Sequence, residues 1–311
     1  MVDHHQKVLI CDTTDSILQK ILEDNGLTVS YLPQITPKEL AEEIGKYEII
    51  IVRSRTKLTS DLVNKAITCK IIARVGVGLD NIDLDAAKAR NIRVINAVEG
   101  ATTAVAELVL AMMFSLARKI PMADKGMRTG KWLKGELKGT ELKGKYLGIV
   151  GIGNIGKRLA RLARALNMNI IGYDPMPIDE KFTKEVGLFK ADLDTLLKSS
   201  DYISLHVPLL KSTKHMINAE KLALMKPTAA IINTSRGGVL DEDALYDALS
   251  ARRLGGAALD VYEIEPATGN KLTKIDNIIL TPHIGAMTME AQSLAANIIG
   301  EKIIQILRGV I

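Results

Sequence analysis

Three side chains in the last third of the sequence could carry acid–base and carboxylate chemistry. They are Arg236 in "NTSRGG", Glu265 in "DVYEIEP" and His283 in "TPHIGA". An imidazole titrates near neutral pH, a carboxylate can orient the ring and favour its charged form, and a guanidinium can bind a carboxylate with two hydrogen bonds. This combination suits a reaction in which negative charge develops on the carbonyl oxygen of a 2-oxo acid.

Each residue taken alone also has a plain structural interpretation. Arg236 could be a surface ion-pair residue, Glu265 a loop carboxylate before Pro266, and His283 a core histidine with satisfied hydrogen bonds. We favour the chemical interpretation because the three occur together at the ends of predicted strands that follow a glycine-rich dinucleotide motif. The carboxyl ends of parallel strands lie at one edge of a sheet. For His206, which ends the run "YISLH", cleft lining and structural packing remain equally open.

A glycine pattern earlier in the chain predicts a dinucleotide site. In "YLGIVGIGNIGKRLARLARALNMNIIGYD" a strand leads into Gly151, Gly153 and Gly156, and a helix follows. The glycines allow a tight turn, close approach of backbone to a pyrophosphate and close helix–strand packing, and the helix N-terminus offers N–H groups to phosphate. Asp174 ends the next strand, where a carboxylate binds ribose hydroxyls and repels a 2′-phosphate, so we expect NAD rather than NADP. An unliganded glycine turn and an S-adenosylmethionine site are the alternatives.

The reaction expected at these residues is hydride transfer between NAD and a small 2-hydroxy or 2-oxo acid. Reduction of the keto carbon leaves negative charge on its oxygen, so a general acid must supply a proton. We expect His283 to be this acid, Glu265 to orient its ring, and Arg236 to bind the substrate carboxylate and polarise the carbonyl.

The elements that must position these groups alternate between strand and helix. A chain of 311 residues exceeds one comfortable hydrophobic core and predicts two domains. Strand-like runs alternate with helical segments to about residue 284, which is typical of parallel βαβ units. We expect an α/β fold of two doubly wound parallel-sheet domains, the second a Rossmann NAD-binding domain. A long helix should run from Thr102 or Thr103 to a break at Pro121.

A segment rich in lysine and glycine, residues 128–145, follows this helix and contains Trp132. We expect an extended surface segment between two folding units. It could be a solvated linker, or an arm that packs on a second subunit and buries the tryptophan.

Composition excludes several classes of function. The formal charge of +5 comes from scattered lysines and arginines, and only 4% of the residues are aromatic, so we expect a small anionic ligand and no nucleic acid. The longest apolar run, Ala104 to Ala117, is too short to span a bilayer and contains Glu107. Two cysteines are too few for a disulfide framework or a cysteine zinc site, and we expect no metal. The first residues lack signal-peptide features, so we expect a cytoplasmic protein.

Together the motifs resemble the D-isomer-specific 2-hydroxyacid dehydrogenase family over nearly the whole chain. The segments that carry the resemblance are "GIVGIGNIG", "YDP", "HVPL", "NTSRGG", "ALDVYEIEP" and "TPHIGA", in this order. The resemblance implies an NAD-dependent enzyme with Arg236, Glu265 and His283 as its catalytic residues, and with Asp260 holding the nicotinamide amide. It implies an NAD site lined by Val77, Gly151, Gly153, Asn154, Ile155, Gly156, Asp174, His206, Val207, Pro208, Thr213, Thr234, Ser235, Asp260, Gly285 and Ala286.

The resemblance also implies the domain organisation. Residues 1–98 with 285–311 would form a substrate-binding domain, and residues 99–284 the NAD-binding domain. Members of the family are usually homodimers built around the long helix that matches residues 102–118, and the last helix, about 288–308, returns to the first domain. The chain ends at Ile311, so we expect a short form without a C-terminal regulatory domain.

Within the family, "IVRSRTKLT" and "IARVGVGLDNIDL" most resemble members that convert 3-phosphoglycerate to 3-phosphohydroxypyruvate in serine biosynthesis. This implies that Arg53, Ser54, Arg74 and Gly76 bind substrate, with the two guanidinium groups on its phosphate; ordinary strand-end cations are the alternative. Other possible substrates are glyoxylate, hydroxypyruvate or another D-2-hydroxy acid, and an NAD-sensing binding protein could use the same scaffold. Val77 and Val207 stand where some relatives carry threonine.

Overall fold

The structure, a computed structural model, describes residues 6–310. The chain divides into two compact units. Unit 1 comprises Met1–Thr102 with Ala286–Ile311, and unit 2 comprises Thr103–Gly285.

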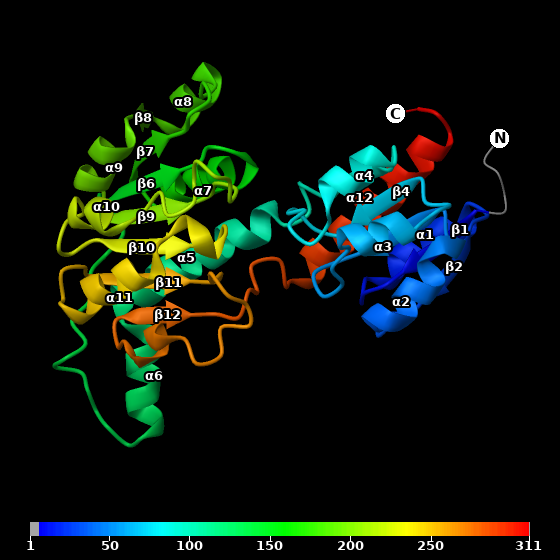
Figure 1. The fold of residues 1–311 in the computed structure, drawn as a ribbon. Coiled ribbons are helices and arrows are strands. Elements are labelled where there is room, and N and C mark those ends of the chain that lie inside the picture. The colour runs from blue at the N-terminus through cyan, green and yellow to red at the C-terminus, as the bar shows by residue number, and fades with distance from the viewer. Residues whose placement is uncertain (1–5, 311) are drawn as a thin grey trace. The chain divides into compact units, whose positions relative to one another are not determined.

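Unit 1 is built on a five-stranded parallel sheet (Figure 1). The strand order is β2-β1-β3-β4-β5, so it reverses between β1 and β3. The strands are β1 (Lys7–Ile10), β2 (Thr28–Tyr31), β3 (Ile49–Val52), β4 (Ile71–Arg74) and β5 (Arg93–Asn96). Alternate residues of a strand point to opposite faces, and each face here is apolar, which explains why helices cover both.

Two groups of helices cover the faces of this sheet. On one face α1 packs against α12, with Leu18 and Leu22 beside Ile299 and Ile303. These two helices are α1 (Ser16–Asp24) and α12 (Met289–Leu307). The opposite face is covered by α2 (Pro37–Glu43), the 3₁₀ turn η1 (Ile44–Lys46), α3 (Ser60–Lys65) and α4 (Leu84–Ala89).

Unit 2 contains a seven-stranded parallel sheet of order β12-β11-β10-β9-β6-β7-β8 (Figure 1). The order reverses between β6 and β9, which is the arrangement of a Rossmann domain. The strands are β6 (Tyr146–Val150), β7 (Asn169–Tyr173), β8 (Leu188–Lys190), β9 (Tyr202–Leu205), β10 (Ala230–Asn233), β11 (Gly256–Leu259) and β12 (Ile278–Leu280). The predicted fold class, two doubly wound parallel sheets, is confirmed.

The helices of unit 2 also lie on both faces of its sheet. One face is covered by α5 (Thr102–Arg118), α7 (Asn154–Ala165) and α8 (Glu180–Val186). The other is covered by α9 (Leu193–Ser199), α10 (Ala219–Ala223) and α11 (Glu242–Ser250), with the 3₁₀ turns η2 (Gly237–Val239) and η3 (Lys271–Lys274) in the connections.

The break in the long helix lies at Lys119 and not at Pro121. α5 ends at Arg118, Lys119 has a left-handed backbone with φ 53°, and α6 (Ile120–Arg128) begins directly after it. Pro121 occupies the first turn of α6, where its missing N–H has no intrahelical partner to lose. The prediction was wrong because this proline begins a helix instead of ending one.

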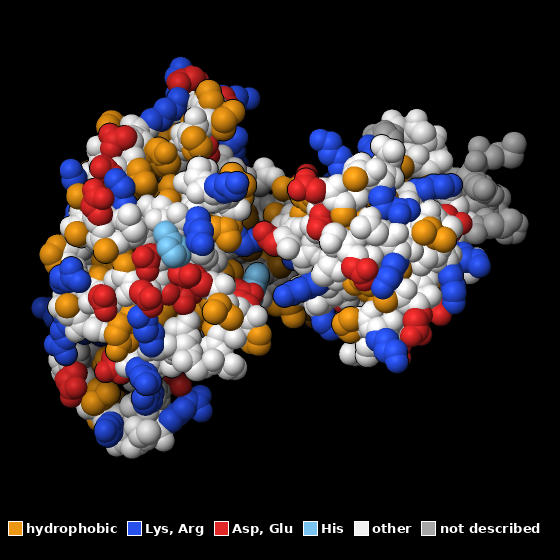
Figure 2. Space-filling view, in the orientation of Figure 1, with side chains coloured by type: hydrophobic (Ala, Val, Ile, Leu, Met, Phe, Trp, Pro, Cys, Tyr) orange, Lys and Arg blue, Asp and Glu red, His pale blue; other side chains and the backbone are white. Residues whose placement is uncertain are grey.

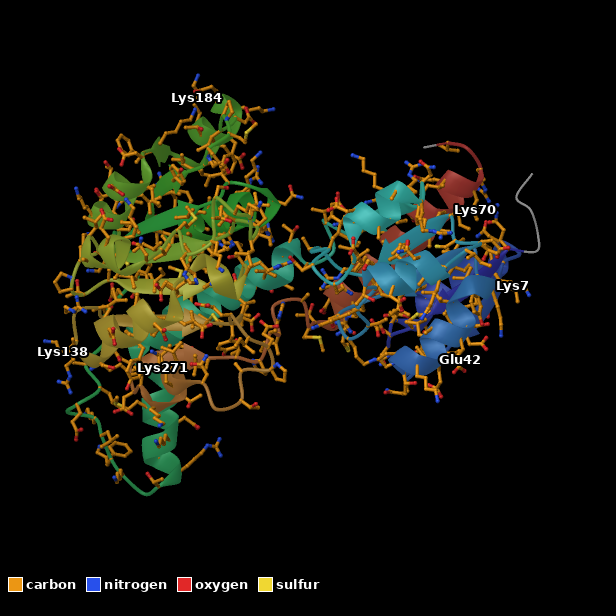
Figure 3. The ribbon with its side chains drawn as sticks, in the orientation of Figure 1. Lys7, Glu42, Lys70, Lys138, Lys184 and Lys271 are labelled. Carbon is orange, nitrogen blue, oxygen red and sulfur yellow. The ribbon has the colours of Figure 1, made fainter. Side chains whose placement is uncertain are left out.

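The lysine- and glycine-rich segment does not join two folding units, because α6 and β6 on either side of it both belong to unit 2. Residues 129–145 form no helix or strand, Trp132 is 76% exposed, and Lys138 points outward in Figure 3. The predicted surface position is confirmed, and the predicted linker between units is wrong.

Charges of both signs are mixed on the visible face of the molecule (Figure 2). On the face drawn in Figure 2, lysine and arginine side chains are interspersed with aspartate and glutamate. The labelled Lys7 and Lys70 of unit 1 and Lys184 of unit 2 point outward (Figure 3). Within residues 6–310 every helix is too short or too polar to cross a membrane.

Candidate active site

Neighbouring strands of unit 2 deliver the candidate residues to one edge of the sheet. β9, β10, β11 and β12 pair in parallel, so the residues that follow them leave at the same edge. His206 follows β9, Arg236 follows β10, Glu265 lies in the loop after β11, and His283 follows β12.

The predicted contact between His283 and Glu265 is present. The Nδ1 atom of His283 lies 2.8 Å from Oε2 of Glu265, and the two side chains are 48% and 37% exposed. The second carboxylate oxygen of Glu265, Oε1, accepts the backbone N–H of Tyr262 at 3.1 Å. The carboxylate is therefore fixed on one side and orients the imidazole on the other.

His283 has a left-handed backbone, with φ 54°. This conformation is uncommon for residues other than glycine, and it costs free energy that other contacts must offset. Those contacts come from Asp260, which is 1% exposed and accepts hydrogen bonds from Thr281 Oγ1 at 2.6 Å and from the N–H groups of Ile284 and Gly285 at 2.8 Å each. Asp260 thus fastens the turn that carries His283. Its predicted contact with a nicotinamide amide stays a prediction.

Arg236 lies in a turn that Asn233 organises. Asn233 is 1% exposed; its Oδ1 accepts the N–H and hydroxyl of Ser235 at 3.0 and 2.8 Å, and its Nδ2 donates to the carbonyl of Arg236 at 2.9 Å. The half-buried guanidinium of Arg236 donates from Nη1 to the carbonyl of Ser235 at 2.6 Å. Asn233 was not among the predicted site residues, although a polar residue that closes the apolar run "AAIIN" could have indicated it.

The turn after β10 packs backbone to backbone against the loop after β11. A Cβ atom placed on Gly237 would lie 1.8 Å from the carbonyl carbon of Tyr262, so only glycine fits there. Tyr262 in turn donates its hydroxyl to the carbonyl of Thr281 at 2.9 Å, and burial raises the pKa of Tyr262 to about 12, which keeps it a donor. Arg236, Glu265 and His283 are thereby carried on three mutually braced segments of unit 2.

The glycine-rich turn fits a dinucleotide. A Cβ on Gly151, whose φ is 98°, would lie 2.5 Å from the carbonyl oxygen of His206, and one on Gly156 would lie 2.2 Å from the carbonyl oxygen of Gly151. By contrast, a Cβ on Gly153 would meet nothing within 4 Å, so the space beside it is open to a ligand. α7 begins at Asn154 without a side-chain cap, which leaves its first N–H groups available to phosphate.

Two further predicted NAD residues lie near this turn. Asp174 is half-buried at the end of β7, and its carboxylate accepts the N–H groups of Ile152 at 2.7 Å and Met176 at 2.9 Å. Thr234 is 8% exposed, and its Oγ1 is buried with no partner within the described chain. Buried polar atoms normally have partners, so Thr234 is suited to a hydrogen bond with a bound ligand.

The remaining predicted NAD residues of unit 2 have other contacts of their own. His206 is half-buried, its Nε2 lies 2.8 Å from Ser204 Oγ, and burial lowers the pKa of His206 to about 4, so the ring is neutral near pH 7. Val207 is 8% exposed and faces the core. The hydroxyl of Thr213 closes a turn by donating to the carbonyl of Pro208 at 2.6 Å and accepting the N–H of Leu210 at 2.8 Å.

The predicted substrate residues lie at adjacent strand ends of unit 1. Arg53 and Ser54 follow β3, Arg74 is the last residue of β4, and Gly76 lies two residues beyond it. Nε of Arg74 donates to the carbonyl of Arg53 at 3.0 Å. Arg53 and Gly76 line a small pocket of unit 1 that Ala286 also borders, whereas Ser54 is exposed.

Val77, assigned to the NAD site by resemblance, is half-buried in the loop after β4, and its carbonyl accepts Asn96 Nδ2 at 2.5 Å. Over residues 6–310, no group of three or more His, Cys, Asp or Glu side chains is placed to hold a metal ion.

Comparison with known proteins agrees with this geometry. Residues 110–285 match the model of the D-isomer specific 2-hydroxyacid dehydrogenase, NAD binding domain. Over 97% of its length the chain is 44% identical to a D-3-phosphoglycerate dehydrogenase of Methanocaldococcus jannaschii, of which it spans 58%.

The matches to two other relatives span most of both chains. A hydroxypyruvate reductase of Thermotoga maritima is 46% identical over 85% of this chain and 86% of its own. The crystal structure of a D-lactate dehydrogenase from Aquifex aeolicus, complexed with NAD and lactic acid, superposes with a TM-score of 0.84 at 31% identity, over 98% of this chain and 96% of that one. The chain belongs to the D-isomer specific 2-hydroxyacid dehydrogenase family and carries its NAD-binding domain.

Proposed function

We propose that the protein is an NAD-dependent dehydrogenase that interconverts 3-phosphoglycerate and 3-phosphohydroxypyruvate, a step of serine biosynthesis. The observation that carries the proposal is the His283–Glu265 pair, at the same sheet edge as the glycine-rich turn, with the loop of Glu265 packed on the turn of Arg236. Bound NAD supplies the acceptor or donor of the hydride. The chain's own residues must then move one proton and hold the charged groups of the substrate.

In the oxidation, His283 acts as the general base. Glu265 holds Nδ1, so Nε2 is the nitrogen that takes the proton of the substrate hydroxyl. The hydride leaves, at the same time, the carbon that bears this hydroxyl. The nearby carboxylate then stabilises the imidazolium. In the reverse direction the same nitrogen returns the proton to the carbonyl oxygen.

Arg236 is assigned to the substrate carboxylate, for which its planar, permanently charged guanidinium is suited. Arg53 and Arg74 are assigned to the phosphate, and Gly76 lets backbone N–H groups reach the substrate. We further assign substrate binding to unit 1 and NAD binding to unit 2.

The test is to follow NADH absorbance in the purified protein with a panel of D-2-hydroxy acids that includes 3-phosphoglycerate, glycerate and lactate. Highest kcat/KM with 3-phosphoglycerate is expected. Turnover of unphosphorylated acids alone would reject the phosphate assignment, and binding of NAD without any turnover would favour an NAD-sensing binding protein.

A second candidate activity is reduction of hydroxypyruvate or glyoxylate, favoured by the similarity to the Thermotoga maritima hydroxypyruvate reductase over most of both chains. The Arg74→Gln variant separates the two. If a phosphate binds there, this change lowers kcat/KM for 3-phosphohydroxypyruvate much more than for hydroxypyruvate. Equal losses would favour the unphosphorylated substrate.

The protein is proposed to act as a cytoplasmic homodimer. Apolar side chains on α5, on α6 and in the segment after it are exposed in the single chain: Phe114 by 42%, Met127 by 59% and Trp132 by 76%. Large apolar side chains left in water are unfavourable, and a partner subunit that covered them would stabilise the protein. Sedimentation velocity should give the mass of a dimer, and Phe114→Asp should shift it toward the monomer.

A further inference from the structure

A buried carboxylate in unit 1 has no role in the proposed chemistry. Asp12 follows β1 and is 2% exposed. Its Oδ2 accepts the backbone N–H of Arg53 at 2.5 Å and that of Thr56 at 3.3 Å, and its Oδ1 accepts the hydroxyl of Thr56 at 2.6 Å. Arg53 and Thr56 lie 41 and 44 residues after Asp12 in the sequence. Because a buried charge is costly unless it is paired and hydrogen-bonded, these contacts strongly constrain the turn from Arg53 to Thr56.

The carbonyl groups of the same turn are held from the other side. Asn81 Nδ2 donates to the carbonyls of Arg53 at 3.1 Å and Thr56 at 2.7 Å, and Arg74 Nε donates to the carbonyl of Arg53 at 3.0 Å. The turn therefore has its N–H groups fixed by Asp12 and its carbonyl groups fixed by Asn81 and Arg74. The backbone of Arg53 is fixed on both sides by these contacts, and this limits where its side chain can lie.

Position and charge both connect Asp12 to ligand binding. The strand order of unit 1 reverses between β1 and β3, and open α/β sheets bind ligands at the carboxyl edge beside such a reversal. Asp12 and Arg53 follow these two strands. Burial lowers the pKa of Arg53, and the nearby charge of Asp12 opposes this shift. Arg55 compensates the carboxylate further, with Nε 3.3 Å from Asp12 Oδ1.

We propose that Asp12 is a positioning residue for substrate binding, which holds the turn from Arg53 to Thr56 so that the guanidinium of Arg53 meets the phosphate of the substrate. This inference rests on the proposed function for its substrate. The role of Asp12 is to fix backbone geometry, and its own carboxylate does not touch the substrate.

Three variants test the role. Asp12→Ala removes every contact with the turn. Asp12→Asn keeps an oxygen for the two N–H groups of the turn and offers its amide to the hydroxyl of Thr56. It loses the charge and the contact with Nε of Arg55, which does not belong to the hydrogen bonds that hold the turn. Asp83→Ala is the matched control, because Asp83 caps α4 in the same unit by accepting the N–H of Ala86 and does not touch the turn.

Loss of charge-assisted hydrogen bonds should make Asp12→Ala raise KM for 3-phosphoglycerate by roughly 10-fold or more, with kcat and KM for NAD within about 2-fold of the wild type. Asp12→Asn should rescue KM to within about 3-fold, and Asp83→Ala should leave it unchanged. An unchanged KM in Asp12→Ala, or an equal rise for NAD, would overturn the proposal. If Asp12→Ala does not fold, Thr56→Val, which removes one of the contacts, is expected to raise KM for 3-phosphoglycerate alone.

A readout independent of activity separates this inference from the proposed function. Amide hydrogen exchange at Arg53 and Thr56, measured by NMR, should be faster in Asp12→Ala and in Thr56→Val than in the wild type or Asp83→Ala. If the wild type does not turn over phosphorylated acids, the proposed function fails, and unchanged exchange in these variants would refute the role of Asp12 by itself.

Discussion

His283 and Glu265 are 18 residues apart in the sequence and are joined by a 2.8 Å hydrogen bond. Replacement of His283 by alanine removes the group that exchanges the proton and leaves the glycine-rich turn of the NAD site untouched. Turnover should therefore fall roughly 10²- to 10⁴-fold, the contribution of general acid–base catalysis, while NAD still binds. Steady-state kinetics and a fluorescence titration with NADH measure the two effects.

The chain offers a matched control for this change. His215 also has a left-handed backbone, with φ 48°, and its Nε2 lies 3.1 Å from a carboxylate oxygen of Glu263. His215→Ala removes the same kind of histidine–carboxylate contact from the same unit and should leave turnover close to the wild-type value. Equal losses in the two variants would mean that His283 acts through stability and not through proton transfer.

Asp174 determines the preference between the two nicotinamide cofactors if its carboxylate meets the ribose. Asp174→Ala should lower kcat/KM for NAD and raise that for NADP, because the variant no longer repels a 2′-phosphate. The ratio of the two values is the measurement, since it cancels any loosening caused by the lost hydrogen bond to Ile152. Asp179→Asn is the control, because it changes an exposed carboxylate that caps α8, and it should keep the wild-type ratio of kcat/KM for NAD to that for NADP. An unchanged ratio in Asp174→Ala would reject the ribose contact.

Among the elements, the turn after β10, which carries Arg236, packs closely on the loop after β11, which carries Glu265. In Gly237→Ala the new methyl group would lie 1.8 Å from the backbone of Tyr262, so one of the two segments must move. Overpacking of this kind costs about 1–3 kcal/mol, and we expect a lower melting temperature together with a fall in kcat of at least about 10-fold.

Gly238→Ala is the neighbouring control for Gly237→Ala. A Cβ at Gly238 would lie 3.3 Å from a side-chain atom of Leu209, and a side chain can move by a few tenths of an ångström. Its melting temperature and kcat should stay near the wild-type values. If Gly237→Ala behaves in the same way, the contact with Tyr262 does not position the site.

The sequence predicted the elements of the fold much better than the contacts between them. Strands and motifs were readable because their signals are local, as in the glycine-rich turn and the apolar runs before Arg236 and His283. Asp12 and Asn233 were missed because the groups that they fix become visible only when the chain is folded; for Asp12 these groups are 41 and 44 residues away. Lys119 was missed because nothing in its side chain favours a left-handed backbone.

For the whole molecule, the buried ring of His206 links stability to pH. Burial lowers the pKa of His206 to about 4, whereas an imidazole in the unfolded chain has a pKa near 6.5. Between these values the unfolded chain binds a proton that the folded chain does not bind. The contribution of a neutral His206 to the free energy of unfolding is therefore complete above about pH 6.5 and is lost as the pH falls toward 4.

At about pH 5 this loss should amount to about 1–2 kcal/mol, the lower figure allowing for the part of the residue that solvent reaches. Urea unfolding at about pH 7.5 and about pH 5 measures it, and His206→Gln, which cannot titrate, should lose less stability between the two values than the wild type does. An equal loss in His206→Gln and the wild type would show that other groups dominate the acid sensitivity of the fold.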